Sequence, residues 1–160
     1  TFEPGETTTS QQHNWILFRY AEILLNYAEA MVNAYGDPDY TGSYSLSARD
    51  AVNQVRNRGD VKMPAYPADM SKDAFLKRLK NERRVEFAFE GQRFWDLRRW
   101  KELDDMQNIY KVKVVKQTDG TIQYTKALHA TYNIQDKMYF YPISNTELFK
   151  NHKLVQNTGW

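Results

Sequence analysis

The strongest constraint on the fold of this chain is a helical stretch that places charged side chains on its apolar face. The stretch covers residues 71–103 and contains NERRVEFAFEGQRFWDLRRW at 81–100. At about 100° per residue, Arg83, Glu86 and Glu90 fall on one side of the helix. Three apolar residues share that side: Phe75, Leu76 and Leu79. Because a buried charge is costly unless an opposite charge satisfies it, the pattern predicts an internal ion-pair network.

We expect this network to be structural and to hold the helices in register. Its members on the stretch are Arg83, Glu86, Glu90 and Asp96. Partners must come from elsewhere in the chain, and the candidates are Glu22, Glu29, Arg56 and Arg58. Under this hypothesis Glu86→Ala lowers the free energy of unfolding by roughly 3 kcal/mol or more, because it leaves a buried arginine unpaired.

Two further helices are predicted before this stretch. Between Asn14, a suitable N-cap, and Gly36, the polar side chains form one narrow stripe, so that helix must be covered on most of its circumference. Ser47 followed by Asp50 is a capping-box pattern, which predicts a helix that ends near Arg58. A loop joins the two helices, so they are expected to form a helical hairpin.

The third helix is predicted to begin after Ser71, to break at Gly91 and to continue to about residue 103. Beyond it, residues 110–126 alternate polar and apolar side chains around an Asp-Gly turn, which predicts a β-hairpin. The segment MYFYPI at 138–143 is expected to be a short strand or an extended segment, followed by a short helix around 146–150.

The expected fold class is therefore mainly α, with helical hairpins, a small β-hairpin and an irregular C-terminal segment. A length of 160 residues with 41% apolar content favours one domain. Within that domain we expect a linker at 1–13, a helical scaffold at 14–103, and the hairpin and C-terminal segment at 104–160.

Composition argues against several classes of protein. The formal net charge is +2, too close to neutral to indicate nucleic-acid binding. The absence of cysteine excludes disulfides, thiolate metal sites and a cysteine nucleophile. No apolar run approaches the length of a membrane span, and the N-terminal TFEPGETTTSQQ does not resemble a signal peptide, so any export signal is expected upstream.

A row of three carboxylates raises the question of catalysis. Glu82, Glu86 and Glu90 line one helix edge, as the paired carboxylates of a glycosidase or a metal site would. Three arginines lie beside them: Arg83, Arg84 and Arg93. An arginine held against a carboxylate lowers its proton affinity, which does not suit a general acid. We expect no catalytic residue, and no metal site or cofactor, because the three histidines fall in predicted loops or termini.

Aromatic residues make up 14% of the chain and offer a second route to function. Such rings can stack on sugars, fill a core or anchor an interface. In the predicted loops, Tyr40, Tyr44 and Tyr66 are the candidates to bind a ligand; the alternative is that they cover the helical core or face a partner. Trp95 and Trp100 are expected to be core or interface anchors.

Three blocks of sequence together resemble the SusD/RagB family, in the family's order and spacing. They are FRYAEILLNYAEAMVNA at 18–34 with AVNQVRNRGDV at 51–61, ERRVEFAFEGQRFWDLRRW at 82–100, and YPISNTELFKNHKLVQNTGW at 141–160. Departures are confined to the last block, where the family prefers proline or a final tyrosine: Ser144, His152, Thr158 and Trp160.

The resemblance implies a scaffold of helical hairpins of tetratricopeptide-like type in a lipoprotein of the outer membrane, on the outer leaflet and facing the cell exterior. Such a protein captures a glycan or other nutrient without catalysis and works with a SusC-like TonB-dependent transporter. Family members are much longer and carry a lipid-bearing cysteine, so this chain resembles a C-terminal segment whose membrane anchor lies outside it.

Two alternatives to nutrient capture stay open at this point. One is a helical protein–protein interaction module without a small ligand of its own. The other is an acid–base glycosidase, which requires a carboxylate pair that opens into a cleft.

Overall fold

The computed structural model describes residues 16–160, which divide into two compact units between Glu86 and Phe87. Within this part of the chain there are five α-helices, two short 3-10 helices and one two-stranded antiparallel sheet. The expected mainly α fold with a small β-hairpin is confirmed. We describe the two units separately; the single domain expected over 1–160 stays a prediction.

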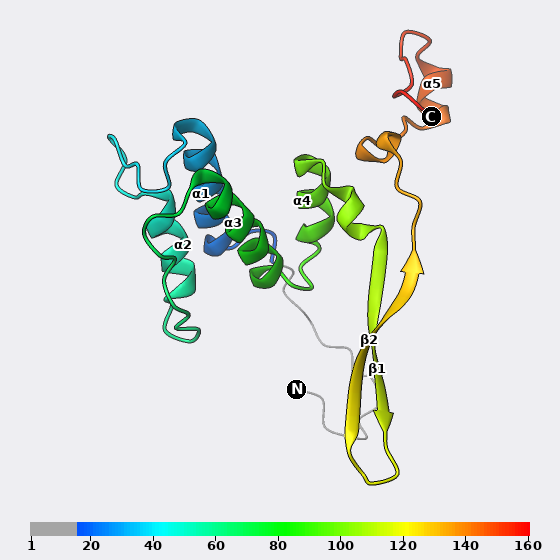
Figure 1. Cartoon of the computed structure of the whole chain (residues 1–160). Helices are drawn as coiled ribbons and strands as arrows, with labels where there is room; N and C mark the ends of the chain where they lie inside the picture. Colours follow the sequence, from blue (N-terminus) through cyan, green and yellow to red (C-terminus); the bar gives the residue numbers. More distant parts are fainter. Residues whose placement is uncertain (1–15) are drawn as a thin grey trace. The chain divides into compact units, whose positions relative to one another are not determined.

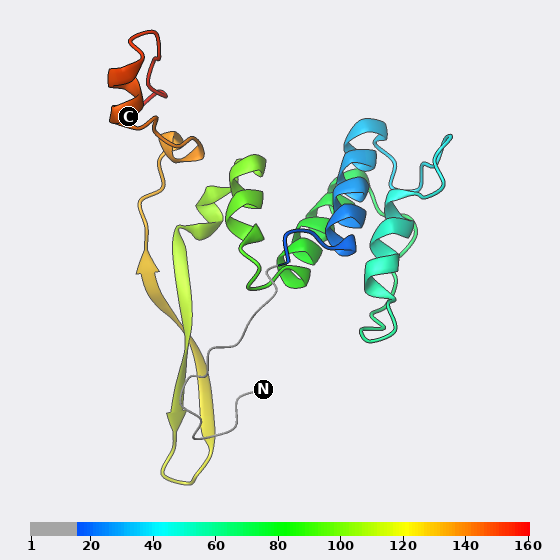
Figure 2. The ribbon, with the colours of Figure 1, turned by 180° about the vertical axis from the view of Figure 1, so that it is seen from behind.

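The first unit is built from three helices, α1 (Tyr20–Tyr35), α2 (Ala48–Arg56) and α3 (Lys72–Glu86). Helix α1 contacts both α2 and α3, and Figures 1 and 2 show the helices side by side. The core consists of side chains that are almost fully buried: Leu25, Ala28, Val32, Ala51, Val52, Phe75 and Leu79. The small residues Ala28 and Ala51 allow the helices to approach closely, as in other tightly packed helix pairs.

Helix α1 is shorter at its start than the sequence predicts. Its predicted cap Asn14 lies outside the described residues, and the helix begins only at Tyr20. The side chains at 16–18 are exposed and pack against nothing in this unit. Without such packing, the conformational entropy lost on ordering a further turn of helix is not offset. Tyr20 is 67% exposed, so the predicted cover around the helix is not formed there. The end is as predicted: Gly36 has a φ of 77°, and its N–H donates to Val32 O at 2.9 Å.

The predicted capping box at the start of α2 is confirmed. Ser47 Oγ accepts a hydrogen bond from Asp50 N at 3.0 Å, and Asp50 Oδ2 accepts one from Ser47 N at 3.2 Å. The start of α3 is also as predicted, because Ser71 Oγ accepts from Ala74 N at 3.3 Å. Two helix starts thus follow from local sequence alone.

The second unit contains, in order, α4 (Gln92–Trp100), η1 (Leu103–Met106), β1 (Asn108–Lys116), β2 (Ile122–Thr131), η2 (Asp136–Tyr139) and α5 (Asn145–Lys150). The predicted break at Gly91 is present, but α3 already ends at Glu86, five residues before it. Phe89 and Gly91 have φ angles of 67° and 77°, in the left-handed region where a right-handed helix cannot continue.

The predicted β-hairpin is confirmed. Strands β1 and β2 pair antiparallel, with Tyr110 opposite Leu128 and Val114 opposite Tyr124, and their twist is visible in Figures 1 and 2. In the connecting loop, Asp119 Oδ1 accepts a hydrogen bond from Thr121 N at 2.9 Å. The apolar face of the hairpin is exposed in this unit, with six side chains each more than half accessible: Tyr110, Val112, Val114, Ile122, Tyr124 and Leu128.

The prediction of a strand at 138–143 is wrong, and the extended alternative describes the segment from Phe140 onward. Its backbone is bonded by side chains from the end of the chain instead of by a neighbouring strand. The Gln156 amide accepts from Ile143 N at 2.8 Å and donates to Ile143 O at 2.9 Å. Asn157 Nδ2 donates to Tyr141 O at 2.6 Å, so the segment has partners without joining a sheet.

Replacing Gln156 with methionine keeps the length of the side chain and removes both hydrogen bonds to Ile143. We expect the free energy of unfolding of the second unit to fall by about 1–2 kcal/mol, since each lost bond contributes on the order of 1 kcal/mol. Hydrogen exchange at the Ile143 amide should accelerate. The matched control is Gln135→Met, at an exposed position of the same unit. Equal exchange at Ile143 in both variants would contradict this account.

Candidate functional site

Three exposed tyrosines gather at the end of α1 in the first unit. Tyr35 ends the helix, and Tyr40 and Tyr44 come from the loop at 36–47. The Tyr35 and Tyr40 rings stack with centroids 4.2 Å apart and planes inclined by 23°, and the hydroxyls of Tyr35 and Tyr44 are 3.1 Å apart. That hydrogen bond raises the pKa of Tyr35. With 38–46% of each residue exposed, the three rings form an accessible surface that we call the tyrosine cluster.

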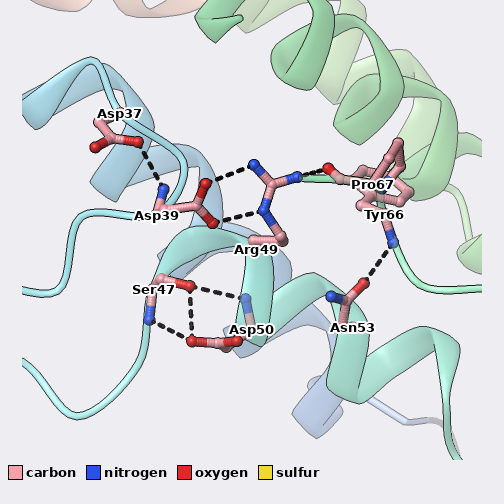
Figure 3. A network of polar contacts seen from close by, with 8 residues as sticks. All are labelled: Asp37, Asp39, Ser47, Arg49, Asp50, Asn53, Tyr66 and Pro67. Atoms are coloured by element: carbon pink, nitrogen blue, oxygen red, sulfur yellow. Dashed lines mark hydrogen bonds and ion pairs between the residues drawn. The ribbon is translucent and has the colours of Figure 1, made fainter. Parts of the chain in front are cut away.

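A buried arginine fixes the loop that carries two of these rings (Figure 3). Arg49 is 7% exposed, and its Nε and Nη2 donate to the two carboxylate oxygens of Asp39 at 2.5 and 2.8 Å. Its Nη1 donates to the carbonyl of Pro67. The bond from Arg49 lowers the pKa of Asp39, so this carboxylate stays charged at neutral pH. Such a bidentate ion pair fixes the relative orientation of the two side chains as well as the distance between them.

Local turns complete the loop. Asp37 Oδ1 accepts from Asp39 N at 2.9 Å, and Arg49 N donates to Pro38 O at 3.0 Å. Gly42 has a φ of 52°, and a Cβ at this position would lie 2.5 Å from the Tyr40 hydroxyl. The loop therefore requires glycine where the Tyr40 ring crosses it, and the tyrosine cluster is held in place before any ligand arrives.

A shallow groove lies along α2 in the same unit. Its volume is about 810 Å³, and one of its lining residues, Leu46, follows Tyr44 by two positions in the sequence. Three side-chain amides line it, those of Asn53, Gln54 and Asn57, and the Asn53 oxygen already accepts a hydrogen bond from Tyr66 N at 2.8 Å. Each amide can both donate and accept hydrogen bonds, as recognition of hydroxyl groups requires.

Tyr66, the third predicted ring, is a core residue. It is 6% exposed, its ring packs edge-on against Phe75, and the Arg56 guanidinium lies 4.9 Å from its centroid. Burial raises its pKa well above the ordinary value. A sugar cannot reach the face of this ring, so the candidate ligand-binding role of Tyr66 is wrong. Tyr35, which the sequence analysis missed, takes its place beside Tyr40 and Tyr44.

Glu86 lies at the centre of the ion pairs in the first unit. Its Oε1 accepts from Arg19 Nη1 at 2.6 Å and also from Arg58 Nη1. Arg19 Nη2 donates at 2.6 Å to the backbone oxygen of Glu86 as well. Burial by itself raises the pKa of Glu86, but the hydrogen bonds from Arg58 and Arg19 outweigh it, and the pKa lies below its ordinary value. The carboxylate is thus charged and unsuited to act as an acid.

The other members of the predicted network divide between the units. Arg83 is 3% exposed, and its Nη1 donates to Asn26 Oδ1 at 2.6 Å in the first unit. Asp96 and Glu90 belong to the second unit, where the buried Asp96 accepts from Arg99 Nε at 2.9 Å and Glu90 is exposed. A structural role for these charges stays a proposal, which the burial of Arg83 and Asp96 supports.

The sequence analysis missed three polar partners: Arg19, Asn26 and Arg49. Arg19 and Asn26 belong to the polar stripe on the first predicted helix, so the sequence did indicate that they need polar partners. For Arg49 the signal is its neighbourhood, because Ala48, Val52 and Val55 form an apolar stripe around it. Arg58 and Arg56, both named as candidates, do pair with acids of α3: Arg58 with Glu86, and Arg56 with Glu82.

Across residues 16–160, no three acidic or histidine side chains gather closely enough to hold a metal ion. In the same range, no helix combines the length and the apolar character needed to cross a membrane.

Removal of the Glu86 charge tests the role of its two arginines. Because the arginine side chains are 27% and 38% exposed, we expect Glu86→Gln to lower the free energy of unfolding by about 2 kcal/mol at pH 7, whereas the sequence analysis expects roughly 3 kcal/mol or more for Glu86→Ala. The folded pKa is lowered, so this stabilisation is present above the unfolded pKa of about 4.3 and is lost as the pH falls through the folded value.

Denaturant titrations between pH 7 and pH 3 measure both the loss of unfolding free energy and its dependence on pH. The variant should lose less stability than the wild type as the solution is acidified. The matched control is Asp60→Asn, which removes the other acidic partner of Arg58, a 76% exposed side chain, and should cost little. Identical pH profiles for wild type and Glu86→Gln would contradict the assignment.

Comparisons with known proteins agree with this architecture. The model of the SusD family matches residues 3–160. Two proteins of Formosa agariphila are similar in sequence: SusD-like protein P38 is 37% identical over 52% of this chain, and SusD-like protein P2 is 31% identical over 61% of it. The crystal structure of a SusD-like protein from Bacteroides fragilis matches 92% of this chain with a TM-score of 0.75 and 33% identity.

The matches cover only part of each relative. They amount to 16% of P38, 19% of P2 and 26% of the Bacteroides fragilis protein. What those complete proteins do is therefore not shown for this chain by similarity alone. The family itself is shown by a match that extends over nearly the whole sequence. On that evidence, this chain belongs to the SusD family.

Proposed function

We propose that this chain is part of a protein that captures a glycan or another nutrient at the bacterial cell surface, without catalysis. Family membership supports this role, and one observation carries it for this chain. The tyrosine cluster presents three exposed rings, one at the end of α1 and two on a loop that the pairing of Arg49 with Asp39 holds in place.

The chemistry of the tyrosine cluster suits a carbohydrate. Sugar rings carry C–H groups on one face, which pack against aromatic rings, and hydroxyls at their edges, which require hydrogen-bond partners. Tyr35 and Tyr40 supply ring surface, and the amides in the groove along α2 supply donors and acceptors. Since the loop is already ordered, binding loses less conformational entropy than it would on a flexible loop.

Binding without catalysis agrees with the state of the carboxylates on α3. Glu82 pairs with Arg56, and Glu86 pairs with Arg19 and Arg58. A general acid at neutral pH needs a raised pKa, whereas the pKa of Glu86 is lowered. These two groups therefore act as structural charges in the proposal.

The proposed setting is the outer leaflet of the outer membrane, with a lipid anchor outside residues 1–160 and a SusC-like TonB-dependent transporter as partner. In this arrangement the protein collects the nutrient and the transporter moves it inward. Similarity to SusD-like proteins supports the setting.

Affinity electrophoresis of the protein through gels containing plant, algal and host polysaccharides tests the tyrosine cluster. A polysaccharide that retards the wild type should retard Tyr40→Ala and Tyr44→Ala less, with affinity lowered about fivefold to tenfold per ring, equivalent to roughly 1 kcal/mol. Tyr124→Ala removes a 68% exposed tyrosine of the hairpin and serves as the control. Undiminished retardation of the two cluster variants would reject this site.

A second candidate function, a protein–protein interaction module, is favoured by a different surface. Ile16, Leu17 and Phe18 are 69–75% exposed, and Tyr20 and Ile23 continue the exposed apolar surface onto α1. Monomeric proteins seldom leave such a contiguous patch uncovered.

Leu17→Asp in the complete protein distinguishes an internal contact from a partner contact. If another part of the same protein covers this surface, the substitution should lower the thermal melting temperature. If the transporter covers it, the melt should be unchanged and co-purification with the transporter should weaken at least tenfold. An unchanged melt together with full co-purification would contradict the interaction module.

A further inference from the structure

The β-hairpin of the second unit presents an apolar face that the rest of the unit leaves exposed. On this face Tyr110 lies opposite Leu128 and Val114 lies opposite Tyr124, and its six apolar side chains are each more than half exposed. No third strand joins the sheet within residues 16–160. Because a two-stranded sheet on its own is marginally stable in water at best, this face requires a surface that covers it.

The hairpin is also strongly basic. Residues 108–131 contain one acid, Asp119, and four lysines, all of them exposed: Lys111, Lys113, Lys116 and Lys126. Asp119 lies in the turn, where its Oδ1 accepts hydrogen bonds from Thr121 N at 2.9 Å and Thr121 Oγ1 at 2.7 Å. In the described part of the chain, none of the four lysines has a carboxylate partner. The covering surface must therefore be negatively charged.

The lysines are distributed over both faces of the sheet. Lys116 and Lys126 share the apolar face, where Lys126 Nζ is 3.9 Å from the ring centroid of Tyr110. Lys111 and Lys113 lie on the opposite face. An element with an apolar face, lysines beside it and tyrosines among its apolar side chains is typical of the boundary between lipid headgroups and acyl chains.

Two other occupants of the apolar face fit the charges less well. A second copy of the hairpin would bring lysines against lysines, because neither strand contains an acid. A protein partner would bury Lys126 and would have to place a carboxylate within an apolar surface, which costs desolvation free energy. A lipid surface avoids both problems, since long lysine stems let the ammonium groups reach phosphates at the headgroups.

We propose that the hairpin binds an anionic lipid surface. Its apolar face enters the headgroup region, and its four lysines lie near the lipid phosphates. The proposal rests on the hairpin alone, so it stands whether or not the tyrosine cluster binds a glycan.

Co-sedimentation with lipid vesicles tests the proposal. The complete protein is used, prepared without any attached lipid so that only contacts of the polypeptide are measured. We expect binding to phosphatidylglycerol vesicles to exceed binding to phosphatidylcholine vesicles about tenfold and to weaken as salt is added. Equal binding to the two lipids would overturn the proposal. So would an absence of binding, which would mean that another part of the protein covers the hairpin.

Charge variants locate the contact. Lys111→Gln combined with Lys113→Gln should lower binding to phosphatidylglycerol vesicles by roughly fivefold or more. The matched control combines Lys72→Gln with Lys77→Gln, which removes the same charge from exposed positions of α3 and should leave binding unchanged. An equal loss of binding in both double variants would overturn the assignment to the hairpin.

A fluorescent label tests entry of the apolar face directly. Because residues 1–160 contain no cysteine, Val114→Cys and Thr125→Cys each add one attachment point, on the apolar and on the opposite face. With phosphatidylglycerol vesicles, the emission of a polarity-sensitive dye should shift to the blue at position 114 and stay unchanged at position 125. Binding by charge alone would leave both labels unshifted and would contradict entry of the apolar face.

Discussion

One carboxylate ties together the ends of three helices in the first unit. Glu86 is the last residue of α3, Arg19 is the N-cap residue of α1, and Arg58 follows the end of α2. Arg19 also donates to the Glu86 backbone carbonyl, a group that lacks a partner within its own helix. The positive charge of Arg19 also interacts favourably with the negative C-terminal end of the α3 dipole. Because hydrophobic packing alone permits helices to slide, we propose that these directional bonds fix the register of the three helices.

Short-range sequence patterns predict most of the helices and strands. Most of the contacts that the sequence does not predict depend on how distant parts of the chain pack together. The helix starts at Ser47 and Ser71 and the turn of the hairpin follow from neighbours within a few residues. The pairing of Arg19 with Glu86 spans 67 positions, so it depends on how α1 and α3 pack. Sequence identified Glu86 as a charge that needs a partner, but not which arginine would reach it. Likewise, nothing local distinguishes the buried Tyr66 from the exposed Tyr40.

The same physical device positions the proposed glycan surface. Arg49 is buried, and its guanidinium donates hydrogen bonds to two loops outside its own helix: to Asp39 in one loop and to Pro67 in the next (Figure 3). Its cost of burial is offset by those bonds, and the result is a loop whose rings need no rearrangement to meet a ligand. In the second unit, Arg98 stacks on the Tyr141 ring and donates to the Tyr139 carbonyl, so it too is bonded outside its own helix.

The amide of Gln156 substitutes for a neighbouring strand, since it satisfies both the N–H and the carbonyl of Ile143. The segment it covers, MYFYPI, contains three aromatic rings, and its Pro142 has no N–H to donate to a sheet. Because side chains already engage the Ile143 N–H and the carbonyls of Tyr141 and Ile143, this edge offers few free backbone groups to a second molecule. The side chains at 156–157 thus cover a stretch of backbone that would otherwise be open to pairing with a second molecule.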